Sequence, residues 1–225
     1  MSPKRCFIIS MCVLATFFIL AFLVSPRVDL SLTRMFIAED TKAFLEVNKY
    51  HFALLDQFMI LVTQFGRELV WPITIVVLFI FGGDTGKKAA IIMVLVMITL
   101  IPIGILSKEI VARPRPFIPN TEVILAADSQ YAYPSGHSMI VAAGATVALA
   151  ELYRNSSARM KAVAIALALE ASLVCFSRIY VGAHYPLDVL GGILLGGGMS
   201  LLFLSQATRI ENLLITIARP FKRGS

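Results

Sequence analysis

The chain has 225 residues, of which 58% are hydrophobic and only 15% are charged. A soluble domain contains about 45–50% apolar and about 25% charged residues, so this composition excludes an ordinary soluble domain, and it also excludes a disordered chain. Residues 1–225 are therefore expected to form a single membrane-embedded domain. The net charge of +6 is attributed to basic residues that flank membrane spans and face anionic lipid headgroups, so no nucleic-acid partner is expected.

Six apolar runs predict six membrane-spanning helices, since a span needs about 20 mostly apolar residues. Lys4 and Arg5 precede the first run, which could also be a signal peptide, but its length and the lack of a clear cleavage site favour a span. The last run contains Gly192-x-x-x-Gly196, a spacing that lets another helix approach closely. The six runs are Cys6–Val24, Leu69–Phe81, Ala89–Leu106, Ser138–Ala150, Ala162–Phe176 and Val189–Leu204.

An amphipathic helix is expected between the first two spans, after a polar stretch over residues 25–50, and it would lie at the interface or against the bundle. Asp56 and Gln57 interrupt its apolar residues, which recur at helical spacing and are Phe52, Leu55, Met59, Val62 and Phe65. The basic, amphipathic tail from Arg209 is expected on the membrane surface. The predicted fold class is an all-α integral membrane protein, a six-transmembrane-helix bundle with one interfacial helix.

Six spans place both termini on the same side of the membrane. The short connections on that side carry basic residues such as Lys87 and Lys88, and the positive-inside rule is reliable for short connections. The termini are therefore expected in the cytoplasm. The opposite ends of the spans would then face the cell exterior, the periplasm or a lumen.

Three polar clusters lie at span ends on the side opposite the termini. The third span ends at Lys108 and the fourth begins near Gly136. The fifth ends at Arg178 and the sixth begins near Pro186, so the topology alone brings the clusters together. They are Lys108–Pro116, Tyr133–His137 and Ser177–Asp188.

These clusters supply positive charge that suits a phosphate group. Arg115 and Arg178 offer planar forks that match phosphate oxygens, and Lys108 adds a point charge. Ser135 and Gly136 open a helix whose first backbone N–H groups lack partners within the helix and form a ready anion site. These five residues are the expected phosphate-binding residues.

Two histidines in the same layer suit phosphoryl transfer, because one can attack phosphorus while the other acts as a general acid. Pro186 suits the first position of a helix, so Asp188 falls in its first turn and can reach back to the imidazole of His184. His184 is therefore the expected nucleophile, Asp188 the residue that orients it, and His137 the expected acid.

Other interpretations of these residues stay open. His137, His184 and Asp188 are possible metal ligands by type, but the surrounding cations would repel a divalent ion, so no metal and no other cofactor is expected. Single basic residues at span ends are usually anchors, and Pro-Ser-Gly is often a helix cap.

Four residues near the clusters have two interpretations each. Glu170, inside the fifth span, is either a structural partner in the bundle or linked to the substrate. Three tyrosines are either interface aromatics or part of a headgroup pocket, and they are Tyr133, Tyr180 and Tyr185.

The clusters resemble the motifs of the type 2 phosphatidic acid phosphatase superfamily, whose site is shared with vanadium haloperoxidases and bacterial acid phosphatases. The motifs Lys-x6-Arg-Pro, Pro-Ser-Gly-His and Ser-Arg-x5-His-x3-Asp all occur without departure within residues 108–188. The resemblance implies metal-independent phosphate hydrolysis through a phosphohistidine, with His184 as nucleophile, Asp188 as its orienting group and His137 as proton donor. The phosphate-holding residues that it implies are Lys108, Arg115, Ser135, Gly136 and Arg178.

Membrane members of this superfamily act on phosphatidate, phosphatidylglycerol phosphate, polyprenyl diphosphates or lipid A phosphates. The short loops and the outward-facing site favour a polyprenyl diphosphate (undecaprenyl- or dolichyl-type) that is converted to the monophosphate. The expected partners are thus this lipid substrate and the surrounding membrane lipids. A lipid phosphotransferase and a non-catalytic phospholipid carrier or receptor remain alternatives, whereas a haloperoxidase does not suit a bundle of spans.

Overall fold

The computed structural model describes residues 2–116, 130–154 and 157–211. These residues form eight α-helices and two π-helical turns (η) and contain no β-strand, which confirms the all-α prediction for this part of the chain. Beyond residue 211, the predicted surface tail lies outside the described residues. The elements are α1 (Pro3–Val24), α2 (Ser31–Val47), α3 (Ala53–Phe65), η1 (Gly66–Val70), α4 (Trp71–Phe81), α5 (Gly83–Val111), α6 (Gly136–Ala148), η2 (Leu149–Tyr153), α7 (Ala158–Tyr180) and α8 (Pro186–Ser205).

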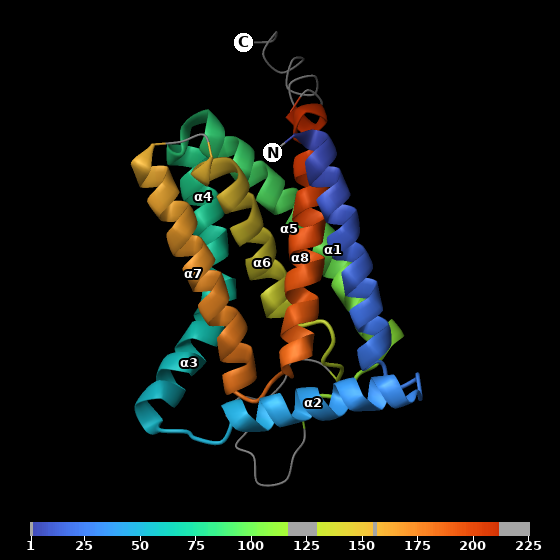
Figure 1. The fold of residues 1–225 in the computed structure, drawn as a ribbon. Coiled ribbons are helices and arrows are strands. Elements are labelled where there is room, and N and C mark those ends of the chain that lie inside the picture. Colours follow the sequence, from blue (N-terminus) through green and yellow to red (C-terminus); the bar gives the residue numbers. More distant parts are fainter. Residues whose placement is uncertain (1, 117–129, 155–156, 212–225) are drawn as a thin grey trace.

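The helices form an upright bundle with one helix across its lower end (Figure 1). α1 packs along α8, α6 packs against both α7 and α8, and α4 packs against α5. α1 begins and α8 ends at the upper end, and α2 lies across the lower end. α5 and α7 end, and α6 and α8 begin, at the end that α2 crosses.

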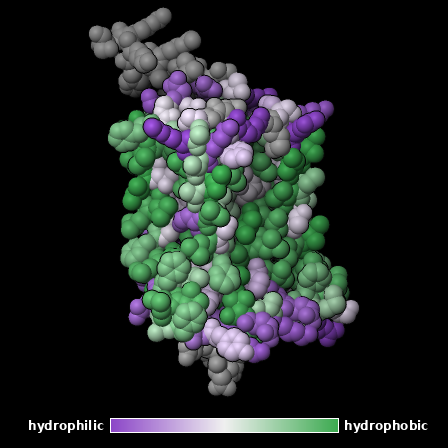
Figure 2. Space-filling view, turned by 60° about the vertical axis from the view of Figure 1, so that its left-hand side comes forward, coloured by the Kyte–Doolittle hydropathy of each residue, from purple (hydrophilic) through white to green (hydrophobic). Residues whose placement is uncertain are grey.

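Five helical segments among the described residues are long and apolar enough to cross a membrane, and they are Pro3–Val24, Ala53–Phe81, Gly83–Val111, Ala158–Tyr180 and Pro186–Ser205. Large apolar side chains are exposed on them, such as Phe18 at 66% and Phe81 at 77%. Figure 2 shows a broad hydrophobic band between two polar ends. Soluble proteins rarely expose so extensive an apolar surface, so the chain is an integral membrane protein.

The second span-length segment differs from the prediction. A separate interfacial helix was expected over Phe52–Phe65, but α3 continues through η1 into α4 and forms one segment, Ala53–Phe81. Asp56, whose charge favoured the interfacial interpretation, accepts a hydrogen bond from Tyr180 of α7 at 2.7 Å and lies 3.0 Å from His51 Nδ1. It lies near the start of α3 and is partly exposed. A paired carboxylate near the end of a span therefore gave the pattern of a surface helix. The helix that lies across the end of the bundle is α2 (Figure 1).

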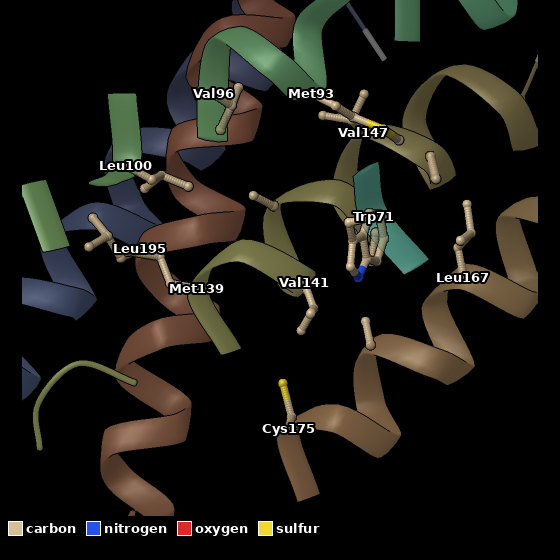
Figure 3. Packing of buried hydrophobic residues seen from close by; sticks show 14 of the residues in the cluster. Trp71, Met93, Val96, Leu100, Met139, Val141, Val147, Leu167, Cys175 and Leu195 are labelled. Atoms are coloured by element: carbon tan, nitrogen blue, oxygen red, sulfur yellow. The ribbon is translucent and has the colours of Figure 1, made fainter. Parts of the chain in front are cut away.

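Buried apolar side chains of α1 and α4 to α8 form the main core, part of which is drawn in Figure 3. Trp71 of α4 is the largest fully buried side chain among the described residues. Its ring lies against Gly144 of α6, where a Cβ would approach the ring Cζ3 to 1.9 Å. Trp71 Nε1 donates to Glu170 Oε2 of α7 at 3.1 Å. This bond favours the structural interpretation of Glu170.

α8 approaches α6 closely through two glycines. A Cβ on Gly192 would lie 2.6 Å from the Ser135 carbonyl oxygen, and one on Gly196 would lie 2.1 Å from the Met139 carbonyl oxygen. The close approach predicted from this spacing is confirmed. It lets the Ser135 N–H donate to the Asp188 carbonyl at 2.9 Å, so the first turns of α6 and α8 are joined.

Candidate active site

Three segments that are distant in sequence meet at the α2 end of the bundle. They are the end of α5, the start of α6 and the connection between α7 and α8. Ala112 directly after α5 (φ 51°) and Gly182 after α7 (φ 77°) both adopt left-handed backbone, which turns the chain sharply at these points. The three sequence clusters therefore converge as predicted.

A pocket of about 280 Å³ lies between these segments. Its charged and histidine residues are Arg67, Lys108, Arg115, His137, Arg178 and His184. Its large apolar residues come from α5 and α6 and are Ile101, Ile105, Met139 and Ile140. This combination suits a molecule with an anionic head and an apolar tail.

Two of the predicted cations are fixed by neighbouring oxygens. Arg178 is buried, and its Nη1 donates to the Thr63 hydroxyl of α3 at 2.6 Å. Lys108, in the last turn of α5, donates from Nζ to the Tyr131 carbonyl at 3.3 Å. Both side chains are held at the pocket, so little ordering is needed when an anion enters.

The start of α6 combines a cap and a pocket wall. Ser135 is fully buried and is the N-cap, and its hydroxyl accepts from the Ser138 N–H at 3.5 Å. Gly136 lines the pocket directly. The structure thus places Gly136 where a phosphate could approach the helix N-terminus, while the side chain of Ser135 orients that terminus.

His184 is buried, with 1% of its surface exposed. Arg115 donates from Nη1 to the Ala183 carbonyl at 2.7 Å and lies 3.1 Å from His184 Nε2. Because an arginine only donates, this contact assigns the acceptor role to Nε2 and the ring proton to Nδ1. Burial, followed by the positive charges of Arg115 and Arg178, lowers the pKa of His184 well below its usual value. The neutral imidazole that a nucleophile requires is therefore favoured.

Asp188 lies beside His184 but is held mainly by other groups. His184 Nδ1 faces Asp188 Oδ2 at 3.7 Å, which is longer than a hydrogen bond. Oδ2 instead accepts from the Tyr185 N–H at 2.9 Å, and Oδ1 pairs with Arg113 Nη1 at 2.7 Å. The expected proximity of Asp188 to the imidazole is observed, and a direct hydrogen bond between them is absent at this distance.

Arg113 links the site to α2. Its Nη2 lies 2.6 Å from Asp40 Oδ2, and Asp40 Oδ1 accepts from the Leu187 N–H at 2.9 Å. Burial disfavours the guanidinium charge, but Asp188 and Asp40 together raise the pKa of Arg113 above its ordinary value. Sequence reasoning missed both Arg113 and Asp40, because neither occupies a motif position and their pairing spans a long stretch of chain.

His137 has an unpredicted basic neighbour. Its Nδ1 lies 3.4 Å from Nη1 of Arg67, which belongs to η1 and also lines the pocket. Arg67 forms an ion pair with the adjacent Glu68. The sequence offered only a weak indication that Arg67 belongs to the site, namely a basic residue just before the apolar run Leu69–Phe81, on the same side of the membrane as the motifs.

The three tyrosines near the motifs take part in packing within the protein. Tyr133 is fully buried, stacks on Phe17 with 5.6 Å between ring centroids and donates to the Phe17 carbonyl at 3.1 Å. Tyr180 is 3% exposed. The ring of Tyr185 lies 4.4 Å from the guanidinium carbon of Arg113. These contacts support the motif segments, and none of the three tyrosines is among the described residues that line the pocket.

Comparison with known proteins agrees with this arrangement. Residues 89–211 match the PAP2 superfamily. An undecaprenyl-diphosphatase of Sulfolobus acidocaldarius is 36% identical over 168 residues, which cover 74% of this chain and 77% of that protein. The undecaprenyl-diphosphatase BcrC of Bacillus subtilis is 29% identical over 175 residues, covering 76% of this chain and 81% of that protein.

A solved structure shares the fold. The crystal structure of a transmembrane PAP2-type phosphatidylglycerolphosphate phosphatase from Bacillus subtilis superposes with a TM-score of 0.67 at 26% sequence identity. The match covers 90% of this chain and 96% of that one. The relatives thus include proteins named for a diphosphate substrate and a protein named for a monophosphate substrate.

Proposed function

This chain belongs to the PAP2 superfamily and is a lipid phosphatase, and we propose that it converts a polyprenyl diphosphate to the monophosphate through a phosphohistidine. The observation that carries the proposal is the placement of His184 Nε2, 3.1 Å from Arg115 Nη1 in a pocket with a cationic end and apolar walls. The diphosphatase relatives support the choice of lipid.

In the first step, His184 Nε2 attacks the terminal phosphorus. A phosphorus–nitrogen bond forms while the bond from phosphorus to the leaving oxygen breaks, and His137 gives that oxygen a proton. Lys108, Arg115 and Arg178 offset the charge on the transferred group, together with the backbone N–H groups at the start of α6.

Asp188 stabilises the positive charge that develops on the attacking imidazole. The carboxylates of Asp188 and Asp40 carry two negative charges and share one positive charge, the guanidinium of Arg113. The three side chains together are therefore left with one negative charge, which balances the positive imidazole. In the second step, water attacks phosphorus, its proton passes to His137, the phosphorus–nitrogen bond breaks and inorganic phosphate leaves.

The membrane arrangement belongs to the same proposal. α6 and η2 together run from Gly136 to Tyr153, which is about 27 Å at 1.5 Å per residue and enough for a sixth crossing. α2 would lie at the membrane interface over the site. Basic residues near the upper ends of the spans, such as Lys87 and Lys88 near the start of α5, support a cytoplasmic location for the termini and the opposite face for the site.

Phosphate release and enzyme labelling test this proposal. Purified native protein and His184→Ala are incubated in detergent with a polyprenyl diphosphate that carries a radioactive terminal phosphate. The native protein is expected to release phosphate and to hold an acid-labile label after rapid quenching. His184→Ala is expected to do neither, while eluting and melting like the native protein.

Three other outcomes have defined meanings. Release at the native rate by His184→Ala contradicts the phosphohistidine route. Label transfer to an added lipid acceptor, without free phosphate, favours the phosphotransferase. Tight binding of the lipid with no turnover by the native protein favours a carrier or receptor.

A further inference from the structure

We propose that Arg67 forms a second phosphate subsite beside His137, which makes the pocket selective for lipid diphosphates over lipid monophosphates. This inference rests on the proposed function, since it assumes that His184 attacks the terminal phosphorus. It goes further, because it assigns the choice between the two substrate classes to one residue outside the three motifs.

The two ends of the pocket are marked by two arginine–histidine contacts. Arg115 Nη1 lies 3.1 Å from His184 Nε2, which defines the end where the phosphorus is attacked. Arg67 Nη1 lies 3.4 Å from His137 Nδ1, which defines the end where the leaving group departs. A Cβ on Gly136 would lie 3.9 Å from Arg67 Nη1. The guanidinium of Arg67 therefore lies next to the first residue of α6.

The orientation of Arg67 is set by Glu68. The Nε of Arg67 donates to Glu68 Oε1 at 2.7 Å, and Nη2 contacts the same oxygen. This edge of the guanidinium therefore faces Glu68, whose side chain is 52% exposed, and the Nη1 edge faces His137. Arg67 itself is 28% exposed, so it lies at the rim of the pocket and can be reached by a ligand.

The leaving group differs between the two substrate classes. When the terminal phosphate of a diphosphate is removed, the leaving oxygen belongs to a second phosphate, which gains negative charge as the bond breaks. When a monophosphate ester is cleaved, the leaving oxygen belongs to an alcohol and carries no phosphate. A guanidinium beside the leaving-group acid can bind the second phosphate through charge-assisted hydrogen bonds, and an alcohol offers it no such partner.

Arg67 also lies next to the group that protonates the leaving oxygen, since its Nη1 is 3.4 Å from His137 Nδ1. A second phosphate bound at Arg67 would therefore lie beside His137 as well, where its leaving oxygen can receive the proton. A monophosphate brings no second phosphate to Arg67, so Arg67 favours the diphosphate.

Two probes with the same tail isolate the number of phosphates. Native protein, Arg67→Gln and Arg67→Lys are assayed in detergent on farnesyl diphosphate and farnesyl monophosphate, and kcat/KM is measured for each. Arg67→Gln is expected to lose about 10-fold to 100-fold on the diphosphate, as for a hydrogen bond to a charged group, and to keep or gain activity on the monophosphate. Arg67→Lys keeps a point charge, so its kcat/KM on the diphosphate is expected to lie between the values of the native protein and Arg67→Gln.

Arg34→Gln is the matched control, since Arg34 is an exposed cation on α2, paired with Asp29. Its diphosphate preference is expected to equal that of the native protein. The subsite would be overturned if Arg67→Gln lost kcat/KM equally on both probes, so that the ratio of diphosphate to monophosphate activity was unchanged. It would also be overturned if Arg34→Gln showed the same loss on the diphosphate. If the native protein releases phosphate from neither probe, the proposed function itself is wrong, and that result differs from any change in ratio.

Discussion

Arg113 Nη1 lies 2.7 Å from Asp188 Oδ1, and the two side chains are 3% and 0% exposed. Arg113, which lies between the motif positions Lys108 and Arg115, thus holds Asp188, the carboxylate that faces the proposed nucleophile His184. On its other side, Arg113 holds Asp40 of α2 at 2.6 Å. The helix across the end of the bundle is therefore joined to the candidate catalytic residues by two buried ion pairs.

Removing Arg113 is expected to slow the reaction more than it weakens substrate binding. Arg113→Gln leaves Asp188 without the group that holds Oδ1, and a displacement of about 1 Å in a catalytic group can cost up to about 100-fold in rate. The expected result is a fall in kcat with a smaller change in KM, partly restored in Arg113→Lys. Initial rates on a polyprenyl diphosphate measure it.

Glu39→Gln is the control for that experiment, since Glu39 precedes Asp40 on α2 but is exposed and pairs only with exposed Lys42 among the described residues. Its kcat is expected to match the native value. Unfolding temperatures in detergent are measured alongside, because removing one partner of a buried ion pair typically costs about 3–5 kcal/mol of stability. An unchanged kcat in Arg113→Gln would rule out the positioning role.

The glycines of α8 give a paired stability test. Gly196→Ala places a Cβ 2.1 Å from the Met139 carbonyl oxygen of α6, whereas Gly197→Ala meets only Thr146 Oγ1 at 3.6 Å. Overpacking of this kind costs about 1–3 kcal/mol, so Gly196→Ala is expected to lower the unfolding temperature and the activity. Gly197→Ala is expected to stay near native. Equal unfolding temperatures for the two variants would contradict the close helix contact.

The pH dependence follows from the environment of His184. Burial and the nearby cations lower its pKa, so the imidazole is expected to stay neutral, and the protein to stay competent for labelling, below the ordinary value of about 6.5. Arg115→Gln removes one positive charge and is expected to raise the pKa of His184. The acid limb of the labelling rate should then move to higher pH, as rapid-quench labelling across a pH series would measure. A shift to lower pH would contradict this electrostatic account.

Chelation is expected to leave phosphate release unchanged. Lys108, Arg115 and Arg178 surround the pocket, and their positive charges would repel a divalent cation from His137 and His184. Phosphate release is compared with and without excess EDTA, and again after magnesium is added back. Loss of activity in EDTA with recovery in magnesium would show that a metal takes part.

The motif residues could be predicted because their relationships are local or follow from topology. Asp188 reaches the neighbourhood of His184 because the two are four residues apart at the start of a helix. Lys108 and His137 converge because α5 ends and α6 begins at the same end of the bundle. Alternating spans bring such ends to the same side of the bundle whatever the packing between the helices.

The boundary of the second span could not be predicted for a related reason. Asp56 and Gln57 reduce the apolar character of Ala53–Phe65, which hydropathy alone interprets as an interfacial segment. Hydropathy does not show that Asp56 is paired: its Oδ1 accepts from the Tyr180 hydroxyl at 2.7 Å, 124 residues away, and lies 3.0 Å from His51 Nδ1. The contact with Tyr180 depends on how α3 packs against α7, which a window of neighbouring residues does not include.

The sequence by itself determined the membrane class, the all-α architecture and the identity of the motif residues, because composition and short spacings carry that information. The tertiary structure alone decided which residues support and extend the site. Arg67 meets His137 across 70 residues, and Arg113 meets Asp40 across 73. Contacts at such separations depend on how whole helices pack against each other, and that packing leaves no periodic signal in the chain.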